Sequence, residues 1–91
     1  MKLSFNKEHD KYVATFEAAS DFNLHIEKGQ KGVVNFYQKS IKDGEYDRFK
    51  DLKFDYDDLV LDADCTALIY PKYIKIVSYT DISKAEVTFI E

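Results

Sequence analysis

Hydrophobic and polar residues alternate with a period of two over much of the chain. This alternation predicts β-strands, because successive side chains of a strand point to opposite faces of a sheet. The segment 11–18 (KYVATFEA) alternates in this way. In the segment 21–27 (DFNLHIE), the pattern places Phe22, Leu24 and Ile26 inward and the polar residues outward, as in a sheet with one face in water.

Three further segments have strand character. They are 33–40 (VVNFYQKS), 72–80 (KYIKIVSYT) and 84–91 (KAEVTFIE). The last two are separated only by the short segment 81–83 (DIS), so we expect them to form a closing hairpin.

The middle of the chain is less regular. The pair Asp43-Gly44 favours a tight hairpin turn, in which both central residues need positive φ. From 45 to 58, the apolar residues fit both helical and strand spacing, so we expect a strand or one short helical turn, followed by an irregular crossover.

The next segment combines aspartates with a short apolar group. Leu59 to Leu61 are predicted to form a short buried strand with aspartates at both of its ends. Cys65 is predicted to begin the next strand (CTALIY), which ends before Pro71 because proline cannot donate a hydrogen bond to the sheet.

Strands of this length and spacing predict an all-β fold, a small antiparallel β-sandwich in which residues 1–91 form a single domain. Two alternatives stay open: a small β-barrel, and an α+β fold with one short helix near residues 46–53. Pro71, Lys72 and Glu91 are expected to protect edge strands from pairing with other chains.

Composition narrows the choice of partners. The net charge of −4 opposes attraction to a polyphosphate backbone, so we expect no nucleic-acid partner. The sequence has no apolar run of signal-peptide or membrane-spanning length, so we expect no membrane partner and favour a cytoplasmic or particle-associated location. Cys65, the single cysteine, cannot form an internal disulfide and is expected to be a partly buried core residue.

An acidic segment raises the question of a metal ion. Nine acidic residues lie between Asp43 and Asp64, against three basic ones. Asp55, Asp57 and Asp58 are the candidate ligands for a weakly bound Ca²⁺, which takes six to eight oxygens. No glycine follows them to make the sharp turn of an EF-hand loop, so the favoured interpretation is a solvated acidic rim and no required cofactor.

Signs of catalysis are sparse. The sequence has no nucleophile elbow, zinc-protease helix motif, paired-cysteine motif or phosphate-binding glycine loop. His9 and His25 are the only histidines, and both are expected to be ordinary surface residues. We therefore expect a binding protein rather than an enzyme.

Tyrosines give the better functional candidate. Tyr73, Lys75 and Tyr79 share one face of the segment 72–80, and Tyr37 lies in a similar pattern. Exposed tyrosines can anchor protein interfaces through a large apolar ring with a polar tip. The simpler interpretation is a central strand whose tyrosines surround the core.

Two functions follow as hypotheses. The first is a non-enzymatic assembly or protein-interaction module of a larger particle or surface complex, which binds a protein partner or a second copy through an aromatic strand face or edge strands. The second is a ligand-binding module, with Ca²⁺ on the aspartate-rich segment or a carbohydrate on the tyrosine face.

Overall fold

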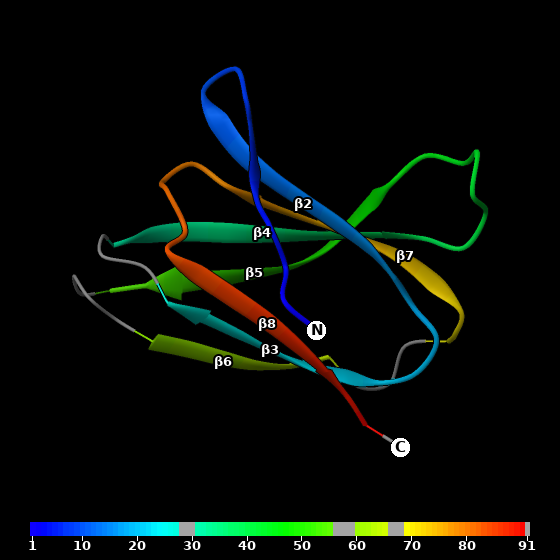
Figure 1. The fold of residues 1–91 in the computed structure, drawn as a ribbon. Helices are drawn as coiled ribbons and strands as arrows, with labels where there is room; N and C mark the ends of the chain where they lie inside the picture. Colours follow the sequence, from blue (N-terminus) through cyan, green and yellow to red (C-terminus); the bar gives the residue numbers. More distant parts are fainter. Residues whose placement is uncertain (28–30, 56–59, 66–68, 91) are drawn as a thin grey trace.

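The protein is an all-β sandwich of two antiparallel sheets, as the alternation predicts (Figure 1). The computed structural model describes residues 1–27, 31–55, 60–65 and 69–90. The larger sheet contains, in spatial order, β1 (Asn6–Glu8), β2 (Lys11–Ala18), β7 (Lys72–Ser78), β4 (Gly32–Lys39) and β5 (Asp47–Phe54). The smaller sheet contains β6 (Val60–Cys65), β3 (Phe22–Glu27) and β8 (Lys84–Phe89).

The core lies between the inner faces of the two sheets. Phe22, Leu24 and Ile26 of β3 are at most 1% exposed, which confirms the inward face predicted for that segment. Ile74 and Ile76 of β7 face them from the larger sheet and are fully buried. Removing these apolar side chains from water is the main favourable contribution to folding.

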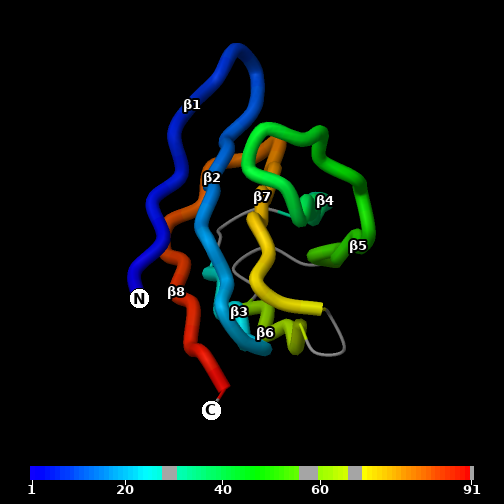
Figure 2. The backbone as a smooth tube through the Cα atoms, turned by 90° about the vertical axis from the view of Figure 1, so that its right-hand side faces the viewer, coloured from blue at the N-terminus to red at the C-terminus, as the bar shows by residue number. Residues whose placement is uncertain are grey.

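The N-terminal segment joins the two sheets along one side. Lys2 forms a bridge with Glu86 of β8, and the Leu3 amide donates a 2.9 Å hydrogen bond to the Ala85 carbonyl. A few residues later the same segment becomes β1 and pairs with β2 of the larger sheet. Figure 2 shows it running along the side where β8 and β2 lie.

The opposite side of the sandwich is bordered by the edge strands β5 and β6. The Lys50 ammonium group reaches across from β5 and donates a 3.2 Å hydrogen bond to the Asp64 carbonyl. The prediction that Pro71 and Lys72 protect an edge is wrong, because they lead into β7, which is an interior strand between β2 and β4. Glu91 lies outside the described residues.

Two predictions for the middle of the chain need correction. The helix near residues 46–53 is wrong: this segment is β5, which pairs with β4 because its apolar side chains pack on the core at strand spacing. The hairpin between these strands is present, but it is not a tight turn with positive φ, since no glycine among the described residues has positive φ. Its connection contains a turn in which the Gly44 amide donates to the Ile41 carbonyl.

The aspartate-rich strand also differs from prediction. Cys65 ends β6 rather than beginning the next strand, and Asp62 and Asp64 lie within β6, not beyond its end. The inward residues are Leu61, which is partly buried against the core, and the small Ala63 and Cys65, so the strand follows a period of two around exposed aspartates. The predicted burial of the 59–61 segment is wrong for Val60, which is 45% exposed, and Leu59 lies outside the described residues.

The predicted closing hairpin is wrong as well. β7 belongs to the larger sheet and β8 to the smaller one, so the segment between them crosses from one layer to the other. The connection from β2 to β3 makes a similar crossing.

Candidate functional site

Tyrosines and lysines gather on the outer side of the larger sheet. In the pairing of β4 with β7, Tyr37 lies opposite Lys75 and Lys39 lies opposite Tyr73. In the same register the buried Phe36 lies opposite the buried Ile76, so Tyr37, Lys39, Tyr73 and Lys75 fall on the other side of the sheet and point away from the core. Tyr46, just before β5, joins them. We call Tyr37, Lys39, Tyr46, Tyr73 and Lys75 the tyrosine-lysine face.

Cation–π contacts connect the members of this face. The Lys39 ammonium nitrogen lies 4.3 Å from the centroid of the Tyr46 ring and 5.9 Å from that of Tyr73. The Lys75 ammonium nitrogen lies 5.5 Å from the Tyr37 ring and 5.4 Å from the Tyr46 ring. Each distance is within the range of about 6 Å at which a ring attracts a cation. The lysine and tyrosine side chains of this face are therefore held in place by contacts with one another.

A β-bulge shapes one border of this face. The register between β4 and β5 shifts between Phe36 and Tyr37, and Arg48 then lies opposite Tyr37. Arg48 forms a two-pronged ion pair with Asp51, with nitrogen-to-oxygen distances of 2.8 and 2.7 Å. An arginine fork matched to a carboxylate in this way is geometrically specific. The bulge thus places a third basic group, Arg48, beside the tyrosines and the two lysines.

Asn35 adds a hydrogen bond to the carboxylate of this ion pair. Its side chain is only 4% exposed, although it points to the outer side of the sheet, and its amide donates a 2.8 Å hydrogen bond to Asp51. The hydrogen bonds from Arg48 and then Asn35 hold the pKa of Asp51 below its usual value. The Asp51 carboxylate is therefore kept charged, and it holds Arg48 in position.

Tyr79 lies apart from the central group. It follows the end of β7 and is 56% exposed. Its ring takes part in none of the cation–π contacts that connect the tyrosine-lysine face. The structure thus brings Tyr37, Tyr73 and Lys75 together and leaves Tyr79 outside this group.

Tyr46 is the member that the sequence analysis missed. It precedes β5 and belongs to no strand, so the alternation that marks Tyr37 and Tyr73 does not include it. Burial raises its pKa, as expected for a phenol partly withdrawn from water.

The candidate metal ligands are only partly described. Asp55 is exposed, and its carboxylate lies 3.4 Å from the Lys53 ammonium nitrogen. Asp57 and Asp58 lie outside the described residues. Among residues 1–27, 31–55, 60–65 and 69–90, no three histidine, cysteine or acidic side chains are grouped to hold a metal ion.

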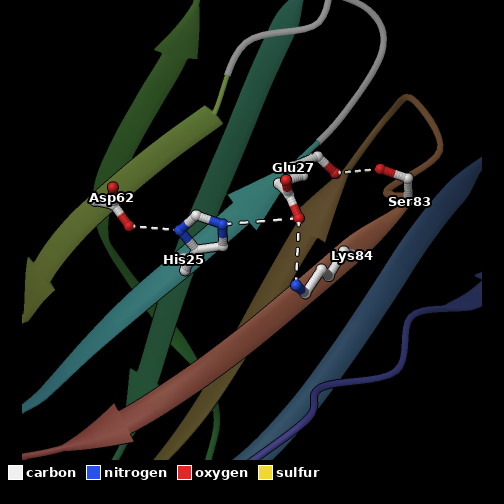
Figure 3. Close-up of polar contacts among 5 residues, drawn as sticks. All are labelled: His25, Glu27, Asp62, Ser83 and Lys84. Carbon is white, nitrogen blue, oxygen red and sulfur yellow. Dashed lines mark hydrogen bonds and ion pairs between the residues drawn. The ribbon is translucent and has the colours of Figure 1, made fainter.

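A polar network crosses the outer side of the smaller sheet (Figure 3). A 2.7 Å hydrogen bond joins His25 Nδ1 to the Asp62 carboxylate, and the other ring nitrogen lies 3.8 Å from Glu27, which also pairs with Lys84. The Ser83 hydroxyl donates to the Glu27 backbone carbonyl and not to His25. A hydrolytic triad requires a hydroxyl or thiol in contact with the histidine, and the Ser83 hydroxyl does not make this contact. The polar contacts of the network instead connect the strands β3, β6 and β8.

Cys65 is a buried thiol, 3% exposed, as the sequence predicted. Burial raises its pKa, with an opposing effect from Lys50 and a smaller raising effect from Asp64. A raised pKa lowers the fraction of the reactive thiolate. The residue acts as a small core side chain.

Comparison of the chain with protein-family models, with curated proteins and with solved structures gives no significant match in any of the three. Nor does the described part of the chain contain a helix with the length and apolarity needed to cross a membrane.

Proposed function

We propose that the protein is a non-enzymatic interaction module of a larger assembly, and that it binds a protein partner through the tyrosine-lysine face. The observation that carries this proposal is the set of cation–π contacts between Lys39, Lys75 and the rings of Tyr37, Tyr46 and Tyr73. Side chains held in place before binding lose less conformational entropy when a partner docks. Tyrosine rings provide apolar area, while the lysines favour a partner with acidic groups beside apolar ones.

The face is a better binding surface than the edge strands. β5 carries Lys50 opposite the buried Phe36, and β6 carries exposed aspartates. Charged side chains on an edge strand oppose pairing with another strand. Of the aromatic strand face and the edge strands, we therefore propose the aromatic face as the binding surface.

The chemistry of the face also favours protein over sugar or single-stranded nucleic acid. Both of those ligands stack flat on open aromatic rings, as bases do on nucleic-acid-binding surfaces. Here a lysine ammonium group lies within 6 Å of the centroid of each of the three rings. A stacked sugar or base would have to displace these lysines.

Lysine-specific cross-linking tests the proposal, because the face contains two lysines. The full chain would be cross-linked in an extract of its source cells, and the linked peptides identified by mass spectrometry. We expect links from Lys39 and Lys75 to one recurring protein, and their loss in the variant Tyr37→Ser/Tyr73→Ser. The control variant Lys7→Ala/Lys42→Ala changes exposed residues outside the face and should keep them.

Two results would contradict the proposal. The first is a set of links spread evenly over all the exposed lysines and unchanged in the tyrosine variant. The second is binding of a single-stranded oligonucleotide or an oligosaccharide that the tyrosine substitutions abolish, because this would assign the face to another class of ligand.

A further inference from the structure

The two outer faces of the sandwich carry opposite charge. On the larger sheet, the outward residues include Lys11, Lys39, Arg48, Lys53 and Lys75, against Glu8, Glu17 and Asp51. On the smaller sheet, the outward residues include Glu27, Asp62, Asp64 and Glu86, against Lys84 and against Lys2, which pairs with Glu86. One face is therefore basic and aromatic, and the other is acidic.

We propose that the tyrosine-lysine face of one copy docks on the outer face of β3, β6 and β8 of a second copy. The inference rests on the proposed function, since it identifies a second copy of this chain as one protein that the face binds. Complementary charge favours this pairing, while two tyrosine-lysine faces would repel each other because both are basic.

The acidic face carries some short side chains beside the longer His25, Glu27, Lys84 and Glu86. Asn23 and Thr88 lie side by side on it, next to Asp64. Val60 adds an apolar group that is 45% exposed. Short side chains of this kind leave room for larger ones from the opposite surface.

This contact is head to tail, because it joins two different surfaces that lie on opposite sides of one molecule. A head-to-tail contact leaves a free face at each end of the pair, so it can add further copies, whereas a two-fold contact stops at the dimer. Three strands of six residues span about 14 by 20 Å, or roughly 300 Å² on each partner. An interface of this size is in the weak, transient class.

Sedimentation equilibrium of the full chain tests the inference. At about 0.01 M salt, where charges act over about 30 Å, the average mass of roughly millimolar protein should rise above the 10.6 kDa monomer and past the dimer. At about 1 M salt, where the screening length falls to about 3 Å, it should return to the monomer.

Charge reversal on either face should abolish association. The basic face is reversed by Lys39→Glu/Lys75→Glu, and the acidic face by Asp64→Lys/Glu86→Lys. Each variant alone should be monomeric, because its two faces now carry charge of the same sign. An equimolar mixture should associate again, since each variant keeps the face that the other has lost. The control Lys7→Glu/Lys42→Glu alters exposed residues outside both faces and should associate like the wild type.

Circular dichroism would check that each variant is folded. If the charge reversal on the basic face prevents folding, the variant Lys39→Gln/Lys75→Gln would replace it. A wild-type chain that stays monomeric at low salt overturns the inference, as does either reversal variant that still associates or a mixture that does not. If the wild type is monomeric while Lys39 and Lys75 cross-link to another protein, only self-association fails. If those cross-links are also missing, the proposed function fails too.

Discussion

Phe22 provides the sharpest test of how the two sheets pack. Its ring is fully buried on β3 and makes an edge-to-face contact with Phe16 of β2, with centroids 5.1 Å apart and planes at 83°. Replacing a buried phenylalanine with alanine costs about 3–5 kcal/mol. A domain of 91 residues has a total stability of about 5–14 kcal/mol, so Phe22→Ala should remove a large fraction of it.

The contact itself can be measured with milder substitutions. An edge-to-face pair contributes about 0.5–1.5 kcal/mol beyond the area it buries. A double-mutant cycle with Phe16→Leu and Phe22→Leu should give a coupling energy of that size. Phe36 makes its edge-to-face contact with Phe49 instead, so a control cycle of Phe16→Leu with Phe36→Leu should be additive within about 0.5 kcal/mol.

Urea unfolding followed by circular dichroism supplies these free energies, provided that the slope with denaturant stays constant across the variants. The reasoning is refuted if Phe22→Ala costs less than about 1 kcal/mol, below the range for a buried phenylalanine. It is also refuted if the Phe16 and Phe22 substitutions are additive, because the sheets would then not meet at this pair.

Three further predictions concern titrating groups. Arg48 and Asn35 hold the pKa of Asp51 low. The stability that these contacts give to the ionised Asp51 carboxylate is therefore present above the ordinary carboxyl pKa and is lost as pH falls through the lowered pKa of Asp51. Asp51→Asn should therefore flatten the stability profile between about pH 5 and pH 2, and an unchanged profile would contradict this. Burial, with a smaller effect from Asp21, raises the pKa of Tyr70 to about 12. Stability should therefore fall as pH rises from about 10 to about 12, and Tyr70→Phe should remove this loss, as measured by thermal melting across that range. Finally, Cys65 should react with a maleimide far more slowly in the native protein than in denaturant, and equal rates would show that the thiol is not buried.

The sequence predicts the strands whose inward residues are large. Phe22, Leu24 and Ile26 alternate with polar residues, and the core takes up all three. The same rule is weaker for β6, because Leu61 is its only large inward residue and the other two, Ala63 and Cys65, are too small to stand out among the aspartates. The period of two is present, but its hydrophobic contrast is weak.

Sheet membership is the part of the fold that local pattern cannot supply. The segment between β7 and β8 has turn chemistry suited to a hairpin, yet the strands belong to different sheets. Long-range packing decides which layer a strand joins, and the five residues between these two strands do not encode it.

The candidate face is likewise predicted only where strands carry it. Tyr37, Tyr73 and Lys75 are brought together by the pairing of β4 with β7, which a single sequence does not reveal. Tyr46 enters from a loop, and the burial of Asn35 depends on Asp51 from the neighbouring strand. The pattern indicates on which side of its strand each residue lies, but not which residues meet there.

The two sides of the sandwich are joined differently, by backbone pairing of the N-terminal segment on one side and by the Lys50 side chain on the other, and this difference affects how the molecule opens. The N-terminal segment ties β8 to β2, whereas β5 and β6 border the opposite side. We therefore expect amide hydrogens of β6 to exchange with solvent sooner than those of β7, which has a hydrogen-bonded neighbour on each side. Because Tyr73 and Lys75 lie on β7, the tyrosine-lysine face belongs to the slowest-exchanging part of the protein and should persist when the opposite side loosens.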